Sequence, residues 1–422
     1  MTACQLAELF LERIDRYDAR LHAYLSVNRD AAVDAERTAA GYSLLRGMPL
    51  AVKDLVDVVG QPNTAASAVL AGNMAESDAE AIMNLRREGA VLLGKTNLHE
   101  FAYGGSGLVG STDPARNPWN TAHITGGSSS GSAAAVAAGL CVAAIGSDTA
   151  GSIRLPASFC GIVGFKPTYG RVSVKGVIPL SVSFDHLGPM TRSGADARIL
   201  FAAMAGIAAP SRRERRKLRI GVPRHYFFRE LEPEVADATE DAICKLKVAG
   251  HDVRDVDFEV NEDRSLQMWE SYQYHAKRAA ESPELYQPET LRRIRTGAQV
   301  TEQVARDAKA KLETIRDTAS EIFTDIDIVL TPTVPMVAPE REMLLAEPDT
   351  LRQRELLMLR NTRPFNVLGT PAISVPWDQS SDGMPIGIQF VAAPNHDFEL
   401  LDFAEEVEEL APWQGRTPPE FS

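Results

Sequence analysis

The chain has 422 residues, a net charge of −13 at pH 7, an apolar fraction of 44% and a charged fraction of 24%, which is the composition of an ordinary globular protein. The excess of acidic over basic residues argues against a surface that binds nucleic acid. No apolar run reaches 18 residues and the four cysteines form no CxxC pair, so we expect no membrane span, structural zinc site or disulfide framework. A cytoplasmic protein that needs no cofactor or metal ion is expected.

Predicted strands and helices alternate along most of the chain, which indicates an α/β sheet. A mostly helical region spans 265–325, and two late strands flank a Ser381-Asp382-Gly383 turn as a hairpin. The other predicted elements are strands 48–59, 90–93, 218–222, 253–258 and 326–330 and helices 193–205, 234–249 and 399–410. No long Pro/Gly/Ser linker and no repeat divides the chain, so one domain over 1–422 is expected.

Lys53 is unusual because it lies in the apolar strand Met48–Val59. Burial lowers the pKa of a lysine and can turn it into a base. The alternative is a lysine at the strand end that reaches solvent or pairs with Asp54 or Asp57. The sequence by itself leaves both interpretations open.

Residues Gly89–Thr96 match the phosphate-loop pattern GxxxxGK[ST] letter for letter. A phosphate loop follows a strand and opens a helix. Here the intervening Ala-Val-Leu-Leu is itself strand-like and a helix precedes it, while residues 97–120 are typical of a glycine-rich loop. We therefore reject a nucleotide site at this point.

The stretch Gly126–Thr168 is rich in glycine and serine, yet it also contains apolar segments. Ala134–Ala138 predicts a buried helix and Leu140–Ile145 a buried strand, whereas flexible linkers lack such segments. Two serine-bearing, glycine-rich turns frame these elements. This combination predicts an active site.

One serine-hydrolase hypothesis places the nucleophile at Ser129, because residues 127–131 match GxSxG. That motif needs a strand before it, and residues 112–125 carry two prolines and no strand signal. It also needs a histidine with an acid later in the chain, and only His186, next to Asp185, offers such a pair. This hypothesis is disfavoured.

Ser152 is the stronger candidate for the nucleophile because it ends a turn of small residues after a predicted buried strand. Four successive backbone N–H groups there are expected to converge on one point, which suits a developing oxyanion. They belong to Thr149, Ala150, Gly151 and Ser152. A serine nucleophile needs a base, and lysine serves in some catalytic sets. In this hypothesis Lys53 is the base, and the Ser128 hydroxyl passes the proton from Ser152 to it.

The motifs of this stretch resemble the amidase signature family. They are Gly126-Gly-Ser128-Ser-Ser-Gly-Ser, Gly146-Ser-Asp148-Thr-Ala-Gly151-Ser152-Ile-Arg154-Leu-Pro, Phe159-Cys-Gly-Ile-Val-Gly-Phe-Lys166-Pro-Thr, Pro49-Leu-Ala-Val-Lys53-Asp and Gly383-Met-Pro-Ile-Gly-Ile-Gln389. The resemblance spans nearly the whole chain. It implies a single α/β/α domain with a large, twisted, mixed central sheet covered by helices.

The resemblance implies a Ser–cis-Ser–Lys triad of Ser152 as nucleophile, Ser128 as bridging serine beside a cis peptide, and Lys53 as base. It implies hydrolysis of a small-molecule carboxamide through an acyl-enzyme, with release of ammonia or an amine. A homodimer is left open. Arg316 falls near a family arginine that can hold a substrate carboxylate.

The sequence departs from the family pattern at Ala150, where a glycine is usual, and the 265–325 region lacks the pattern associated with a glutamine pocket. A stand-alone amidase is therefore the leading hypothesis. The alternatives are the glutaminase A subunit of a tRNA-dependent amidotransferase, which requires partner chains, and a catalytically inactive scaffold.

Overall fold

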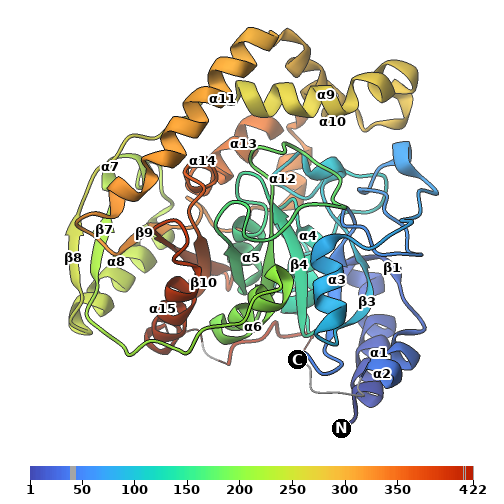
Figure 1. Ribbon diagram of the computed structural model, residues 1–422, viewed down its shortest axis with the longest axis horizontal. Coiled ribbons are helices and arrows are strands. Elements are labelled where there is room, and N and C mark those ends of the chain that lie inside the picture. The colour runs from blue at the N-terminus through green and yellow to red at the C-terminus, as the bar shows by residue number, and fades with distance from the viewer. Residues whose placement is uncertain (39–43, 412, 414, 422) are drawn as a thin grey trace.

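The central feature of the computed structural model, which describes residues 1–38, 44–411, 413 and 415–421, is one large sheet (Figure 1). Its strands are β1 (Tyr24–Val27), β2 (Pro49–Lys53), β3 (Val91–Thr96), β4 (Ala143–Asp148), β5 (Val163–Lys166), β6 (His186–Thr191), β7 (Arg219–Val222), β8 (Asp252–Asp255), β9 (Ile328–Pro332), β10 (Ala372–Gln379) and β11 (Pro385–Ala392). The order across the sheet is β1-β3-β2-β4-β6-β5-β10-β11-β9-β7-β8.

The sheet is mixed, as predicted. β2 runs parallel to both β3 and β4, and β7 runs parallel to β8 and β9. The strands between these two groups pair antiparallel. The predicted hairpin is confirmed, because β10 and β11 are antiparallel neighbours with Ala372 opposite Val391.

Helices cover both faces of the sheet. They are α1 (Ala3–Leu21), α2 (Ala31–Thr38), α3 (Glu80–Arg87), α4 (Ser130–Ala137), α5 (Arg154–Cys160), α6 (Gly194–Ala205), α7 (Arg224–Phe227), α8 (Pro233–Val248), α9 (Ser265–Glu281), α10 (Pro288–Thr296), α11 (Glu302–Asp317), α12 (Arg341–Leu345), α13 (Leu351–Met358), α14 (Pro364–Val367) and α15 (Asp397–Leu410). Within the described residues, none of them is both long and apolar enough to cross a membrane.

Alternation along the strands creates two cores. In β2, Leu50 and Val52 join the core beneath α3, α6, α8 and α15, whereas Ala51 joins the core beneath α1, α2, α4 and α5. Successive side chains of a strand point to opposite faces, so both faces must be apolar where helices cover both. The result is a single α/β domain of three layers.

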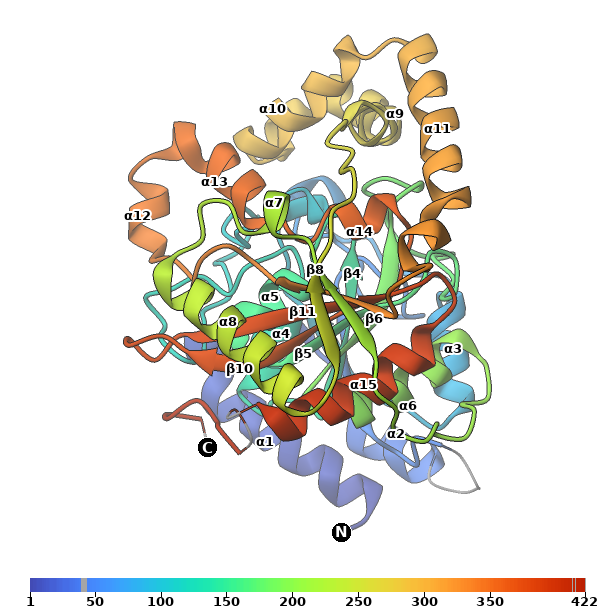
Figure 2. The same ribbon diagram turned by 90° about the vertical axis from the view of Figure 1, so that its left-hand side faces the viewer.

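The predicted helical region after residue 265 forms α9, α10 and α11. Figures 1 and 2 show these helices above one edge of the sheet, with α13 and α14 between them and the strands. Both marked chain ends lie on the opposite side of the molecule (Figure 1). Residues on the α13–α14 segment therefore face the strand ends from which the candidate site is built.

Two predicted boundaries near the site were wrong in extent. The strand expected over 48–59 ends at Lys53, where the chain turns and the Leu55 N–H donates to the Lys53 carbonyl at 2.8 Å. The strand expected over 140–145 is β4, which continues to Asp148 because Ser147 and Asp148 pair with Leu187 and His186 of β6. Strand pairing overrides the turn-like composition of this segment.

Candidate active site

Lys53 lies at the carboxyl end of β2, and its side chain is fully buried. Its Nζ lies 2.7 Å from Ser128 Oγ and 2.8 Å from Ser147 Oγ. Burial lowers the pKa of Lys53 to about 7, although Asp148 and Asp185 oppose the shift. The lysine neither reaches solvent nor pairs with Asp54 or Asp57, so that interpretation was wrong. A buried amine held by two hydroxyls is suited to exchange protons near neutral pH.

The backbone around Ser128 is held from several sides. The Gly127–Ser128 peptide is cis, as the resemblance implied. The Ser128 carbonyl accepts the His99 N–H at 3.1 Å, and the Gly127 N–H donates to the Gly105 carbonyl at 2.7 Å. A Cβ at Gly127 would lie 2.7 Å from the Gly107 nitrogen. Only glycine allows the 105–107 loop to approach this closely, and the approach helps to fix the position of the Ser128 hydroxyl.

Ser152 lies in the turn after β4 and is 4% exposed. Its carbonyl accepts the Ser129 N–H at 3.2 Å, so the two serine-bearing turns meet although 24 residues separate Ser128 from Ser152. The turn that carries Ser152, after β4, therefore adjoins the Ser128–Ser129 turn. The Ser128 hydroxyl in turn contacts Lys53 at the end of β2, the parallel neighbour of β4.

The positive φ of the nucleophile turn falls on Gly151, at +134°, and not on Ala150. Ala150, where the family usually has a glycine, therefore needs no glycine-only backbone conformation. A Cβ at Gly151 would meet Thr362 Oγ1 at 2.0 Å. The turn depends on glycine at 151 and tolerates alanine at 150.

One N–H of the expected oxyanion array has another partner. The Gly151 N–H donates to Asp148 Oδ1 at 2.8 Å, so the array of four amides requires a correction. Thr149, Ala150 and Ser152 remain as candidate donors. The physical reason is that the Asp148 carboxylate lies inside the turn and takes the nearest amide.

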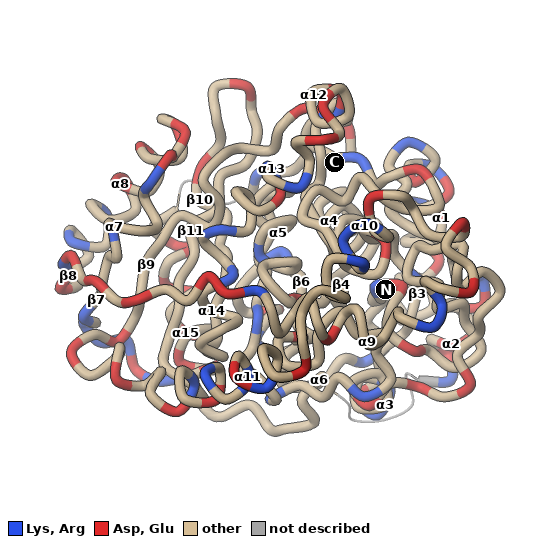
Figure 3. The backbone as a smooth tube through the Cα atoms, turned by 90° about the horizontal axis from the view of Figure 1, so that it is seen from above, with Lys and Arg blue, Asp and Glu red and all other residues tan. Residues whose placement is uncertain are grey.

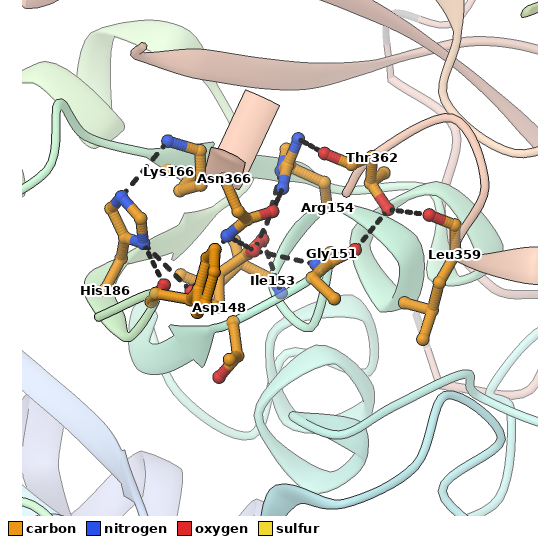
Figure 4. A network of polar contacts seen from close by, with 12 residues as sticks. Asp148, Gly151, Ile153, Arg154, Lys166, His186, Leu359, Thr362 and Asn366 are labelled. Carbon is orange, nitrogen blue, oxygen red and sulfur yellow. Dashed lines mark hydrogen bonds and ion pairs between the residues drawn. The ribbon is translucent and has the colours of Figure 1, made fainter. Parts of the chain in front are cut away.

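The Asp148 carboxylate is the centre of a buried network that shapes the turn (Figure 4). It accepts the Gly151 and Ile153 N–H groups and pairs with the Arg154 guanidinium, whose Nη2 lies 2.9 Å from Oδ1. Asn366 Nδ2 donates to the same Oδ1 at 2.8 Å. Burial would raise the pKa of Asp148, but Arg154 and the hydrogen bonds hold it well below its usual range. The carboxylate is therefore charged and orients the residues on both sides of Ser152.

Lys166 of β5 and His186 of β6 also belong to this buried network. Lys166 Nζ donates to the Pro167 carbonyl at 3.0 Å and to that of Thr370, and it lies 3.4 Å from His186 Nε2. His186 Nδ1 contacts the Asp148 and Phe184 carbonyls at 3.1 and 2.7 Å. Burial lowers the pKa of both Lys166 and His186. The histidine considered for a serine–histidine triad is thus a neutral structural group.

Sequence analysis missed three residues at the site. Ser147 contacts Lys53, and Asp185 accepts the Thr149 hydroxyl at 2.6 Å. Thr362 Oγ1 donates to the Ala150 carbonyl at 2.7 Å. Ser147 lies inside the Gly146–Pro156 motif and Asp185 directly precedes His186. Both residues were therefore in segments already considered, but the sequence does not show which residues they contact. Thr362 lies 210 residues beyond Ser152, and nothing local in the sequence marks it.

Ser129 and Arg316 have structural contacts. Ser129 Oγ donates to the Ser147 carbonyl and accepts the Ser147 N–H, each at 3.2 Å. Arg316 donates to the carbonyls of Ser183, Val367 and Asn366 and lies 3.9 Å from the centre of the Tyr169 ring. The Arg316 guanidinium thus joins α11 to the end of α14 and to the segment before β6.

A model of the amidase family matches residues 5–401. The A subunit of glutamyl-tRNA(Gln) amidotransferase from Synechococcus sp. (strain CC9311) is 36% identical, over 99% of this chain and 96% of the relative. A solved amidase superposes with a TM-score of 0.88 at 34% identity, covering 97% and 96% of the two chains. The 6-aminohexanoate cyclic dimer hydrolase gives a TM-score of 0.88 at 31% identity, covering 100% and 96%.

Fold, site and similarity define one class: hydrolases of the amidase signature that act on C–N bonds. The chain belongs to the amidase family.

Proposed function

We propose that the chain is a stand-alone amidase that cleaves a carboxamide through an acyl-enzyme on Ser152. The observation that carries the proposal is the 2.7 Å contact between Lys53 Nζ and Ser128 Oγ at the carboxyl end of β2, beside the turn that presents Ser152. A lysine with a pKa near 7 is substantially neutral at physiological pH and accepts a proton.

Each step of the reaction uses a group already described. Ser152 Oγ attacks the amide carbon while its proton passes through Ser128 to Lys53. The Thr149, Ala150 and Ser152 N–H groups are the candidate donors to the oxyanion. Collapse returns the proton through the same relay to the leaving nitrogen, which departs as ammonia or an amine. Water then attacks the acyl-enzyme, gives its proton to the relay and releases the carboxylate.

The matched pair Ser152→Ala and Ser129→Ala tests the assignment. Ammonia or amine release should fall by at least about 10³-fold in Ser152→Ala. It should stay within tenfold of wild type in Ser129→Ala, because the Ser129 hydroxyl bonds to the backbone of Ser147 and the substitution keeps the backbone bond to Ser152. A fluorophosphonate probe should label Ser152, and a catalytically inactive scaffold would not react. Retention of more than a few per cent of activity in Ser152→Ala contradicts the proposal.

A second candidate is the glutaminase A subunit of a tRNA-dependent amidotransferase, which the 36% identity to such a subunit favours. Two observations favour the stand-alone enzyme. The 470 aligned positions exceed the 422 residues of this chain by 48, so the relative has segments that this chain lacks. The nucleophile turn also faces an apolar cluster that contains Ala150, Met358 and Leu359. Co-purification with partner subunits, together with glutamine hydrolysis coupled to aminoacyl-tRNA, would favour the subunit.

A further inference from the structure

The loop at residues 104–107 packs against the Gly127–Ser128 peptide and has almost no side chains of its own. Its sequence is Gly-Gly-Ser-Gly, so Ser106 supplies the only side chain. The carbonyl of Gly105 in this loop accepts the Gly127 N–H at 2.7 Å. Glycine has more conformational freedom than any other residue. A loop of this composition therefore needs an anchor elsewhere in the chain if it is to hold the relay serine in place.

The anchor of Ser106 is Glu355 of α13. The Ser106 N–H and hydroxyl donate to Glu355 Oε1 at 3.1 and 2.6 Å, although 249 residues separate the two. The Glu355 side chain is fully buried. Hydrogen bonds that end on an ionised group are about twice as strong as neutral ones. A charged Glu355 is thus a firm attachment point for the loop.

Two arginines keep Glu355 charged. The nearest nitrogen of Arg293, on α10, lies 2.7 Å from Glu355 Oε2, and that of Arg352, on α13, lies 3.9 Å from it. Figure 3 shows basic positions on both helices. Burial by itself would raise the pKa of Glu355, but the two arginines and the Ser106 hydroxyl hold it below its usual value. The carboxylate therefore accepts hydrogen bonds as an anion.

His99 fills the space between this carboxylate and the relay serine. Its backbone N–H donates to the Ser128 carbonyl at 3.1 Å, and its Nδ1 lies 3.7 Å from Glu355 Oε1. Burial lowers the pKa of His99 to about 3, so the imidazole is neutral. A Cβ at Gly104 would lie 2.1 Å from the ring. The ring, the loop and the carboxylate therefore pack together beside Ser128.

The end of α13 also reaches the nucleophile turn. Leu359 lies one helical turn after Glu355, and its N–H donates to the Glu355 carbonyl at 3.1 Å. A Cβ at Gly151 would lie 3.1 Å from Leu359 Cδ2, and a Cβ at Gly105 would lie 3.3 Å from Leu359 Cδ1. One turn of chain therefore contacts both the loop over the relay serine and the turn of the nucleophile.

We propose that Glu355 is a positioning residue for the reaction. Through Ser106 it holds the 104–107 loop against the Gly127–Ser128 peptide, and this keeps the Ser128 hydroxyl at proton-transfer distance from its two partners. The proposal rests on the proposed function, because it assumes that Ser128 carries the proton. Misplacing a reacting group by about 1 Å can lower a rate on the order of 10²-fold.

A misplaced relay has a chemical signature that a loss of folded protein lacks. On an amide the relay acts twice, since it takes the proton of Ser152 and then gives one to the leaving nitrogen. A p-nitrophenyl ester of the same acyl group releases a phenolate, which departs without a proton. A misplaced Ser128 should therefore slow the amide more than the ester, whereas partial unfolding slows both equally. The amide-to-ester ratio of kcat/KM is the readout.

Three variants test the anchor. Glu355→Ala removes both hydrogen bonds to Ser106 and should lower kcat/KM for the amide about 10²-fold and the amide-to-ester ratio about tenfold. Glu355→Gln keeps an oxygen that accepts from Ser106, so its ratio should return to within about threefold of wild type. Ser106→Ala leaves the Glu355–Arg293 ion pair in place and should lower the ratio about threefold. Adding Ser106→Ala to Glu355→Ala should cause no further loss.

The matched control is Glu289→Gln. Glu289 is a second carboxylate at the same arginine, with Oε1 2.7 Å from Arg293 Nε, and it also accepts from Arg292. This variant should leave the amide-to-ester ratio unchanged. A ratio that falls as far in Glu289→Gln as in Glu355→Ala would show that only the charge balance of Arg293 matters, which overturns the proposal.

The variants are measured beside Ser152→Ala. If Ser152→Ala is inactive while Glu355→Ala and Ser106→Ala keep the wild-type ratio, the proposal is overturned and the proposed function stands. If Glu355→Ala does not fold, Ser106→Ala decides, and an unchanged ratio in it overturns the proposal. If Ser152→Ala hydrolyses the amide as wild type does, the proposed function fails and the role of Glu355 fails with it.

Discussion

Two buried lysines on neighbouring strands show how context separates a base from a structural cation. Lys53 ends β2 and Lys95 lies next to it on β3, with Lys53 opposite Thr96 in the parallel register. Both side chains are fully buried. Lys95 Nζ lies 3.1 Å from Asp54 Oδ1 and 2.8 Å from the Pro62 carbonyl, whereas the contacts of Lys53 are two serine hydroxyls.

The difference lies in what compensates the charge. Burial lowers the pKa of both lysines, and Asp54 opposes the shift at Lys95 from hydrogen-bonding distance. The carboxylates that act on Lys53, those of Asp148 and Asp185, are bound to Arg154 and Thr149 instead. An ion pair favours the charged form of a lysine, while hydroxyl partners permit the neutral form that a base needs.

Of the substitutions that test this difference between the two lysines, replacement of Lys53 should have the largest effect on activity. Lys53→Met should lower kcat/KM by at least about 10³-fold, because the relay loses its proton acceptor. The thermal midpoint at pH 6 should stay the same or rise, since the buried cation disappears. Ammonia release and calorimetry measure the two effects. Retained activity in a folded Lys53→Met protein would refute the assignment of the base.

Replacing Lys95 should instead act on stability. Lys95→Met leaves the Asp54 carboxylate buried without its cation and should lower the free energy of unfolding by about 3–5 kcal/mol. Urea denaturation measures the loss. The double variant Lys95→Met/Asp54→Asn should recover part of it. A loss below about 1 kcal/mol in the single variant would show that the ion pair is not structural.

The pH dependence should report the neutral form of Lys53. Its pKa of about 7 predicts that kcat/KM rises with pH, about tenfold per unit below 7, and then levels. Burial raises the pKa of Asp185 to about 7, so this carboxylate favours the charged lysine only near and above that pH. Asp185→Asn should therefore move the midpoint of the limb to lower pH. The measurement is a pH–rate profile for wild type and variant. A limb that moves to higher pH in Asp185→Asn would contradict the electrostatic assignment.

Ser147 should have the smallest effect. Ser147→Ala removes one of the two hydroxyls that hold Lys53 Nζ, and a lost hydrogen bond of about 1 kcal/mol lowers kcat roughly fivefold. KM should not change, because Ser147 is proposed only to position the lysine. Steady-state kinetics separates the two constants. A change confined to KM would assign Ser147 to substrate binding.

The phosphate-loop match shows the limit of a motif without its context. Gly94, Lys95 and Thr96 lie in β3 and not at the start of a helix, which confirms that this segment lacks the strand–loop–helix context of a phosphate loop. Gly94 serves sheet packing, because a Cβ there would meet the Ser26 carbonyl oxygen at 2.2 Å. The neighbouring elements in the sequence were enough to decide this case.

The sequence by itself determined the family, the α/β class and the choice of Lys53, Ser128 and Ser152 as candidates, while the mixed sheet was implied by the family resemblance. It could do so because these features depend on local patterns: alternating strands, glycine-rich turns and short motifs with fixed spacing. The β10–β11 hairpin and the helix that begins after Ser193 follow from the same local signals.

Only the tertiary structure decided which partners these residues have. The N–H of Gly151 bonds to Asp148, the hydroxyl of Thr362 holds Ala150, and Ser147 holds Lys53. Contacts across the chain depend on how helices pack at the strand ends, and burial there sets the charge and pKa of each group.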